Sequence, residues 1–301
     1  MLLDHLLDHI SLEVEPFAIC RVQRGWRLAL PAERTVQLHF VVAGSGRLIA
    51  GQWSASLSRC TLAIIPAGVD HRVQPDSEVE REVTARAARR HSAAIGAEII
   101  AGDDDNDLGL SMICGRTVAT FGEALGLFDQ LDQPLVQSFG EAPEVEELFA
   151  QLVAEQLAVR PGVRRMTQLY MEQCLVHLFR QLCDGDECAL PWLAALEDPQ
   201  LSRALGAVLA EPAANHSVES LAEAAAMSRS VFSRRFAEAF STTPGDFVRR
   251  VRLRRAAELL RTTDLPIKAI AVRVGFASRS HFSRAFKAEL GRNPATYRID
   301  S

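Results

Sequence analysis

The chain has 301 residues and a mass of 33.0 kDa, a length that favours two domains over one. Hydrophobic residues make up 48% of it and charged residues 24%, which excludes a mainly disordered protein. No apolar run approaches the roughly 20 residues of a membrane-spanning helix, and the N-terminal segment is acidic where a secretion signal is basic. We therefore expect a cytoplasmic protein with no membrane partner.

The net charge of −5 conceals two parts of opposite sign. Residues 212–301 contain 16 Lys and Arg against 8 Asp and Glu, a net charge of +8, and the rest of the chain contains 17 against 30, or −13. This asymmetry indicates that the C-terminal third approaches a polyanion, either nucleic acid or an anionic membrane surface.

The N-terminal part contains short strand-like runs that are separated by Gly and Pro turns. The runs cover residues 36–42, 47–50, 54–58 and 61–65. Regular short strands of this kind are typical of a small antiparallel barrel or a jelly roll. We expect a barrel over about residues 11–140, followed by helices over about 143–196.

Two segments of this part resemble the sequence signatures of the cupins. Residues 66–71 resemble the second signature, and His39 with residues 41–44 resembles a partial first one. A cupin metal site has about three His and a carboxylate, but this chain has Gln37 and Ala43-Gly44 where further ligands would stand. His39 and His71 are the remaining metal candidates, and two ligands do not make a strong site. We therefore predict neither a metal nor another cofactor, and interpret both residues as histidines of the barrel interior.

Two amphipathic helices are predicted at residues 143–159 and 163–183, separated by Arg160-Pro161-Gly162. The apolar surface of both helices can pack within one chain; the alternative, in which one face covers the barrel and another pairs with a second copy of the chain, is what the family resemblance described below implies. Residues 190–199 then form the connection to the C-terminal part.

The C-terminal third contains an internal repeat with an offset of fifty residues. Residues 231–240 align with 281–290, and Ser228-Arg-Ser230 recurs as Ser278-Arg-Ser280. Each copy predicts a helix, a tight turn and a second helix that is capped by the first of these serines. The second helices carry Phe at helical spacing, at positions 232, 236, 240, 282 and 286. We expect this stripe to be core and not a platform for stacked bases.

With the phenylalanines buried, the opposite face of each second helix presents Ser and Arg. These residues are Arg229, Ser230, Ser233 and Arg234 in the first copy and Arg279, Ser280, Ser283 and Arg284 in the second. A helix in the major groove presents its N-terminal half to base edges, where Arg bonds guanine O6 and N7. One exposed Arg alone would be a solvated charge, but the recurrence of Ser-x-x-Ser-Arg favours DNA contact.

A long helix is predicted between the two copies. It begins at Thr243-Pro244, with Thr as N-cap, and runs to about Arg261. A length of roughly 25 Å would hold the two Ser–Arg helices about one turn of DNA apart. Some of its arginines are expected to meet phosphate and others to pair within the domain; they lie at positions 249, 250, 252, 254 and 255.

Residues 198–301 resemble the DNA-binding domain of the AraC/XylS family of bacterial transcription regulators. The segments that carry the resemblance are, in order, residues 221–236, 243–244, 252–260 and 270–298. The resemblance implies two helix-turn-helix motifs, at about 218–240 and 267–290, joined by a linker helix at about 244–261. Ser241 departs from the family pattern, which has a helix-ending Gly such as Gly291; a left-handed Ser costs about 1 kcal/mol.

Residues 1–197 resemble the cupin-type sensor and dimerisation domain of one AraC-like subfamily, so the expected fold class is α+β with two domains. Cys20 and Cys114 match positions where such domains often carry Cys, including a member that responds to reactive chlorine. An exposed thiolate near Arg21 or Arg116 would make either cysteine a redox switch, and buried, inert thiols are the alternative.

The sequence thus predicts a DNA-binding transcription regulator without catalytic residues, whose N-terminal domain senses a small molecule or an oxidant. Its expected partners are double-stranded DNA, RNA polymerase and a second copy of the chain, and the resemblance implies that activation is the commoner outcome. The main alternative is a metal-dependent cupin enzyme, an isomerase or dioxygenase, with an appended DNA-binding domain. A third is an architectural DNA-binding protein that is indifferent to sequence and inducer.

Overall fold

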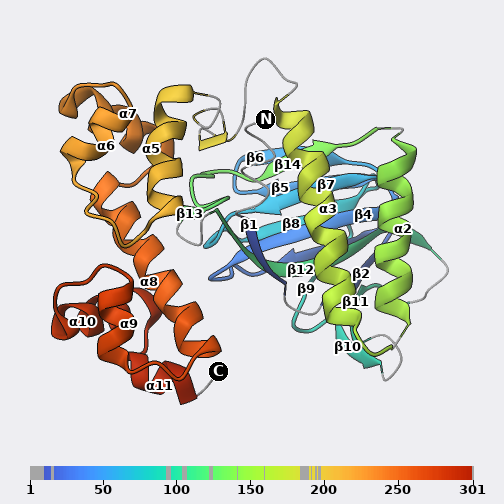
Figure 1. Ribbon diagram of the computed structural model, residues 1–301. Helices are drawn as coiled ribbons and strands as arrows, with labels where there is room; N and C mark the ends of the chain where they lie inside the picture. Colours follow the sequence, from blue (N-terminus) through green and yellow to red (C-terminus); the bar gives the residue numbers. More distant parts are fainter. Residues whose placement is uncertain are drawn as a thin grey trace. The chain divides into compact units, whose positions relative to one another are not determined.

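A computed structural model describes residues 10–14, 17–92, 96–103, 107–121, 125–140, 142–158, 160–183, 190, 192–193, 195 and 198–299. The chain forms two compact units. The β-rich unit comprises Leu12–Ala119 and Leu131–Ala189, and the helical unit comprises Met1–Ser11, Thr120–Gln130 and Leu190–Ser301. This confirms an α+β chain with a β-rich N-terminal and a helical C-terminal part (Figure 1). The domain boundary at residues 197 and 198 stays a prediction.

None of the helices in the described segments combines the length and the hydropathy that crossing a membrane requires.

The larger sheet has nine described strands. Their bounds are β1 (Ile10–Val14), β2 (Ala18–Gln23), β4 (Val36–Gly44), β7 (Thr61–Ile65), β10 (Arg89–Ser92), β11 (Gly96–Ala101), β12 (Leu108–Phe121), β13 (Leu125–Gly126) and β14 (Leu135–Ser138). The strand order is β10-β11-β2-β12-β4-β7-β14, and β1 and β13 also pair with β12. β12 therefore lies at the centre of the sheet and is its longest strand.

The smaller sheet has five strands in the order β6-β5-β8-β3-β9. They are β3 (Trp26–Leu30), β5 (Gly46–Ala50), β6 (Trp53–Leu57), β8 (His71–Pro75) and β9 (Arg81–Thr84). The described strands pair in two separate sheets, so the expectation of a closed barrel is wrong. Alternating apolar residues and Gly or Pro turns occur in barrels and in double sheets alike, and this pattern does not distinguish them.

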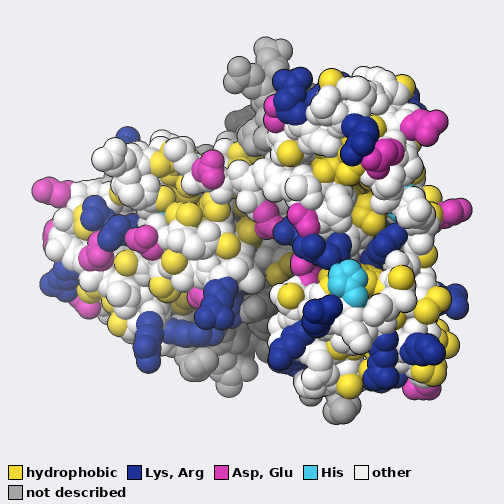
Figure 2. All heavy atoms as spheres, turned by 90° about the vertical axis from the view of Figure 1, so that its left-hand side faces the viewer, with side chains coloured by type: hydrophobic (Ala, Val, Ile, Leu, Met, Phe, Trp, Pro, Cys, Tyr) yellow, Lys and Arg dark blue, Asp and Glu magenta, His cyan; other side chains and the backbone are white. Residues whose placement is uncertain are grey.

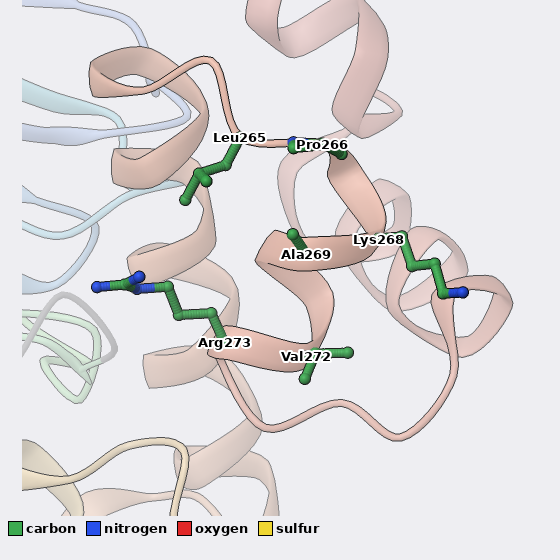
Figure 3. Close-up of a pocket in the computed structure, with 6 residues that line it drawn as sticks. All are labelled: Leu265, Pro266, Lys268, Ala269, Val272 and Arg273. Atoms are coloured by element: carbon green, nitrogen blue, oxygen red, sulfur yellow. The ribbon is translucent and has the colours of Figure 1, made fainter.

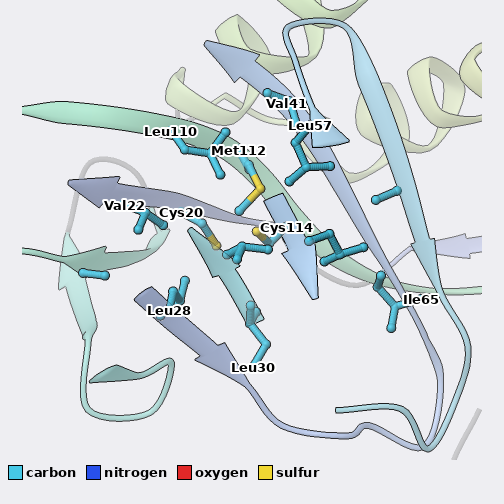
Figure 4. Packing of buried hydrophobic residues seen from close by; sticks show 14 of the residues in the cluster. Cys20, Val22, Leu28, Leu30, Val41, Leu57, Ile65, Leu110, Met112 and Cys114 are labelled. Carbon is cyan, nitrogen blue, oxygen red and sulfur yellow. The ribbon is translucent and has the colours of Figure 1, made fainter. Parts of the chain in front are cut away.

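The core of the β-rich unit lies between the inward faces of the two sheets. β2, β4 and β12 contribute residues from the larger sheet, and β3, β5 and β8 from the smaller one. Figure 4 shows the side chains of Cys20, Met112 and Cys114 in this core, with their sulfur atoms in the same region. This hydrophobic cluster is therefore rich in sulfur.

Two helices cover the outer face of the larger sheet, α2 (Pro143–Leu157) and α3 (Val163–Cys183), and they pack side by side (Figure 1). α2 meets β4 through an edge-to-face contact of Phe149 with Phe40, whose ring centroids are 4.8 Å apart. Since side chains alternate along a strand, Phe40 faces the helices while its neighbour His39 faces the interior. Both helices lie close to the predicted positions.

The helical unit contains seven described helices. They are α5 (Pro199–Ala210), α6 (Val218–Ala224), α7 (Arg229–Phe240), α8 (Pro244–Thr262), α9 (Ile267–Arg273), α10 (Arg279–Leu290) and α11 (Pro294–Ile299). The pair α6–α7 packs at one part of α8, and α9, α10 and α11 pack at another (Figure 1). The predicted caps of the long helices form, because Ser228, Thr243 and Ser278 each accept a backbone N–H with their side-chain oxygen.

The repeat extends to unusual backbone conformations. Within the turns that join the helix pairs, Ala226 and Gly275 have positive φ values of 52° and 86°. At the ends of α7 and α10, Ser241 and Gly291 are the left-handed C-caps, with φ values of 47° and 74°. The first and the second helix of each pair thus end with a left-handed residue, which carries a Cβ in the first copy and is glycine in the second. From the left-handed residue of the turn to the serine N-cap, the second copy is one residue longer.

We expect Ser241→Gly to stabilise the helical unit. Glycine adopts the left-handed conformation without the steric cost of Cβ, so the free energy of unfolding should rise by about 0.5–1 kcal/mol. Urea unfolding of wild type and variant measures this difference. Gly291→Ser, the reverse change at the matching position, should lower the unfolding free energy by a similar amount. An unchanged or lowered stability of Ser241→Gly would contradict the strain assigned to this cap.

The phenylalanine stripe of the repeat is core, as predicted. Phe232, Phe236, Phe282 and Phe286 are buried. Phe282 lies 5.4 Å from Phe276 and 5.5 Å from Phe286 between ring centroids, within the cluster that α8, α9 and α10 enclose. The rings therefore fix which face of α7 and α10 turns outward.

Candidate functional site

The outward faces of α7 and α10 have matching exposure. In the first ten residues of each helix, buried, half-buried and exposed positions follow the same order. Arg229, Ser230, Arg234 and their counterparts Arg279, Ser280, Arg284 are exposed, and Ser233 and Ser283 are half-buried. The structure thus brings each predicted set together on one helix, at the N-terminal half that a major groove would accept.

The arginines of these faces differ in their contacts. Arg229 forms an ion pair with Glu219 of α6, with the nitrogen and oxygen 2.8 Å apart. Within the described part of the chain, Arg234 and Arg284 form neither an ion pair nor a hydrogen bond. Both are exposed cations at equivalent positions, and their guanidinium groups remain available for an external anion or base edge.

A neighbouring arginine, Arg235, has a structural role that the sequence did not reveal. It donates hydrogen bonds to Asp198 and Gln200 at the start of α5. Asp198 also caps that helix by accepting the backbone N–H of Gln200. Arg235 therefore fixes α7 against α5, and the serine–arginine pattern points to Arg234 alone.

Most arginines of α8 are held within the unit. Arg252 donates to the carbonyl oxygens of Pro212, Ala214 and Gly275 at 2.7–3.1 Å, and burial lowers the pKa of its guanidinium. Arg249, Arg250 and Arg255 form ion pairs with acidic side chains of the same unit. Figure 2 shows Lys and Arg side chains gathered on the face that lies to the left in Figure 1. Four of the six arginines of α8 are thus engaged within the unit, three of them with carboxylates, so Arg234 and Arg284 are the stronger candidates for contact with DNA.

An open, apolar pocket lies on α9 and the residues just before it, and none of its lining residues belongs to α7 or α10. Its lining comprises Leu265, Pro266, Lys268, Ala269, Val272 and Arg273 (Figure 3). Val272 is 65% exposed, and Lys268 and Arg273 extend from the helix in different directions. The sequence had marked α9 only as the first helix of a pair, since the exposure of one Val within an amphipathic helix leaves no local signal.

The two candidate metal ligands meet inside the β-rich unit. His39 of β4 and His71 of β8 are buried, and their Nε2 atoms are 2.6 Å apart. Two nitrogens on one tetrahedral metal would be about 3.4 Å apart at metal–nitrogen distances of about 2.1 Å. Among the described residues, no group of three or more His, Cys, Asp or Glu could hold a metal ion. The residues present therefore fit a hydrogen-bonded histidine pair and not the cupin metal site.

We expect this pair to make stability depend on pH. Burial lowers the pKa of His71 to about 4 and that of His39 well below its usual value. Between pH 6.5 and about 4, the unfolded chain takes up a proton at His71 that the folded chain does not, so the free energy of unfolding falls as pH falls. Between pH 6.5 and 5 this loss should be roughly 2 kcal/mol.

Urea unfolding of wild type and His71→Gln at several pH values measures that loss. The variant has no proton to take up at this position, so its unfolding free energy should depend less on pH over the same interval. Identical pH dependence of the two proteins would show that the imidazole is not shielded as the structure has it.

Cys20 of β2 and Cys114 of β12 lie next to one another in the core. Burial raises the pKa of Cys114 well above its usual value, and a hydrogen bond with Cys20 adds to this effect. The nearby cations point elsewhere, since Arg21 pairs with Glu98 and Arg116 with Glu33. The structure therefore brings the two predicted thiols together and buries both of them.

Comparisons with known proteins match both parts of the chain. A family described as Cupin matches residues 2–184, more than half of the chain, and one described as Helix-turn-helix domain matches residues 221–299. The transcriptional regulator AlkR of Acinetobacter baylyi is 27% identical over 99% of both chains. A putative AraC-like transcription regulator of Streptomyces antibioticus is 34% identical over 61% of both chains.

One solved structure among the matches is the DNA-binding domain of AdpA in complex with a target DNA. It is 33% identical to this chain, covers 34% of it and 91% of its own length, and has a TM-score of 0.33. Two relatives that match the chain over nearly its full length, AlkR and MtrA of Neisseria gonorrhoeae, bear the names of transcription regulators and not of enzymes.

Proposed function

Because the chain belongs to the AraC-like transcription regulators, with a cupin domain ahead of a helix-turn-helix domain, we propose that it regulates transcription by placing α7 and α10 in successive major-groove segments of one duplex. The two helix pairs, α6–α7 and α9–α10, are the two helix-turn-helix motifs of this proposal. Membership of the family makes the chain a DNA-binding regulator and not a cupin enzyme.

The observation that carries the proposal is the matching outward face of α7 and α10. Equivalent Ser and Arg residues occupy it, and Arg234 and Arg284 form no ion pair among the described residues. An exposed Arg without an internal acceptor is free to bond guanine bidentately, and Ser230, Ser233, Ser280 and Ser283 accept or donate at base edges or phosphates. Arg229 and Arg279, at the first position of each helix, are proposed to contact DNA beside these residues.

α8 supports the spacing that this mode of binding requires. It has 19 residues, which at about 1.5 Å each give a rod of about 28 Å. Arg250 of α8 pairs with Glu289 of α10 at 3.5 Å, and the ring of Phe247 lies 5.6 Å from that of Phe236 in α7. Both Ser–Arg helices are thus fixed to one rod. We therefore expect α7 and α10 to contact the duplex at two places about one turn of DNA apart.

The β-rich unit is proposed to sense a small molecule or an oxidant and, as its output, to alter contact with RNA polymerase or with a second copy of the chain. For an oxidant, the proximity of Cys20 and Cys114 supports a thiol pair as the reactive element. Each of the two thiols would lose one proton and one electron to the oxidant, and a disulfide would form between the two sulfur atoms. Because both thiols are buried, this reaction requires the two sheets to open locally.

Selection of bound sequences from random duplexes tests the proposal, with and without the thiol oxidant diamide, which is reduced to its hydrazine as the disulfide forms. We expect the full chain to enrich a sequence with two conserved segments, and diamide to change its affinity for that sequence. Cys20→Ser and Cys114→Ser should abolish the change, and Cys174→Ser, at a buried cysteine of α3, should retain it. Binding without enrichment would overturn sequence-specific recognition, and an unchanged affinity in diamide would overturn the oxidant.

A further inference from the structure

The helical unit includes a segment from the middle of the chain, Thr120–Gln130. This segment is the continuation of β12, the strand that carries Cys114 in the core of the β-rich unit. Thr120 and Phe121 pair with Gly126 and Leu125 of β13, and a turn follows in which the N–H of Asp129 donates to the carbonyl oxygen of Gly126. Chain continuity alone thus joins the sulfur-rich core to a hairpin of the helical unit.

The hairpin is anchored within the helical unit by a buried hydrogen bond. The indole N–H of Trp192 donates to the carbonyl oxygen of Leu127 at 2.6 Å. Trp192, Leu127 and Phe128 are buried, so the turn is a packed part of this unit. A buried indole N–H needs an acceptor, and the hairpin backbone supplies it.

From this anchored turn, Gln130 reaches the end of α7. Its side-chain Nε2 donates to the carbonyl oxygen of Ala239 at 2.7 Å. The last four carbonyls of a helix have no partner within it. At α7 the N–H of Ser241 donates a hydrogen bond to the carbonyl oxygen of Ala237, and the side-chain amide of Gln130 donates one to that of Ala239. The hairpin therefore supplies a C-terminal cap to the helix whose other end carries Ser230 and Arg234.

Only one of the two polar atoms of the Gln130 side-chain amide has a hydrogen-bond partner among the described residues. The Oε1 atom of Gln130 is buried and has no hydrogen-bond partner among the described residues. An unpaired buried acceptor offsets much of what the Nε2 hydrogen bond contributes. The docked and released states of Gln130 are consequently close in free energy. A small change in either unit can therefore shift the population from one state to the other.

We propose that Thr120–Gln130 couples the two units, so that a change in β12 is transmitted through Gln130 to the C-terminal turn of α7, and DNA bound at α7 is transmitted back to β12. The inference rests on the proposed function of α7. The alternative is a brace that stabilises the helix end and carries no signal.

Hydrogen–deuterium exchange of the full chain separates these cases, with Gln130→Ala as the test variant and Gln133→Ala, at an exposed glutamine of the following loop, as the matched control. Without DNA, the amides of residues 237–241 should exchange about fivefold faster in Gln130→Ala than in wild type or Gln133→Ala, because the cap is lost. Equal exchange in all three proteins would overturn the cap.

The second comparison adds a duplex that wild type has selected, with its binding followed by fluorescence anisotropy. In wild type and Gln133→Ala, DNA should change the exchange of β12 amides at residues 110–117 by about fivefold, and in Gln130→Ala the change should vanish. The same change in Gln130→Ala would make the hairpin a brace only. A chain that binds the duplex without any change in β12 would overturn the coupling alone, whereas a chain that binds no duplex would overturn the proposed function as well.

Discussion

Replacing both Arg234 and Arg284 with Ala is expected to weaken binding to the selected duplex by about 2–6 kcal/mol, because each bidentate arginine–guanine contact contributes about 1–3 kcal/mol. The two side chains lie at equivalent, exposed positions of α7 and α10 and form no ion pair in the described part of the chain. Each single variant should lose about half of the total and relax sequence preference in one of the two segments. Fluorescence anisotropy with specific and random duplexes measures both effects.

Two further variants separate recognition from charge. Arg234→Lys and Arg284→Lys keep the charge but lose the planar fork, so they should weaken specific binding and leave binding to random duplexes nearly unchanged. Arg261→Ala, at an exposed arginine near the end of α8, removes the same charge outside the two helix faces. Equal losses on specific and random duplexes in the Arg234 and Arg284 variants would make these residues phosphate contacts and refute base recognition.

Phe282→Ala should lower the free energy of unfolding by about 3–5 kcal/mol, the usual cost of a cavity of this size. Phe282 is fully buried in the cluster that α8, α9 and α10 enclose, where its ring meets Phe276 and Phe286. Urea unfolding measures the change. Phe282→Leu fills most of the space and should cost less.

The same two variants test whether the aromatic stripe stacks on bases. A buried ring makes no contact with DNA, so Phe282→Leu should bind the selected duplex with nearly the affinity of wild type. A variant that keeps its stability but loses DNA affinity would contradict the core role of the stripe.

The elements of the helical unit were predictable because their signals are local. The spacing of Phe282 and Phe286 sets the buried face of α10, and Ser278, Thr243 and Pro244 mark helix starts through their own side chains and ring. Because the repeat carries the same pattern twice, each copy supports the prediction made from the other. The left-handed cap at Ser241 follows from its alignment with Gly291 and not from its own residue type.

Features that depend on distant segments were not predictable. Alternating apolar residues in β4 and β8 did not reveal two open sheets, or that His39 and His71 bond each other directly. Arg252 appeared equivalent to Arg254 in the sequence, yet only the fold brings three carbonyl oxygens to it. The hairpin that holds Gln130 against α7 joins residues more than one hundred positions apart, and no local pattern reports such a contact.

The central claim is that α7 and α10 bind one face of a duplex about one helical turn apart. A hydroxyl-radical footprint of the full chain on its selected duplex tests it most directly. The account predicts two protected segments whose centres are about 10 base pairs apart, with Arg234→Ala weakening protection of one and Arg284→Ala that of the other. A single protected segment, or protection that both variants weaken equally throughout, would contradict it.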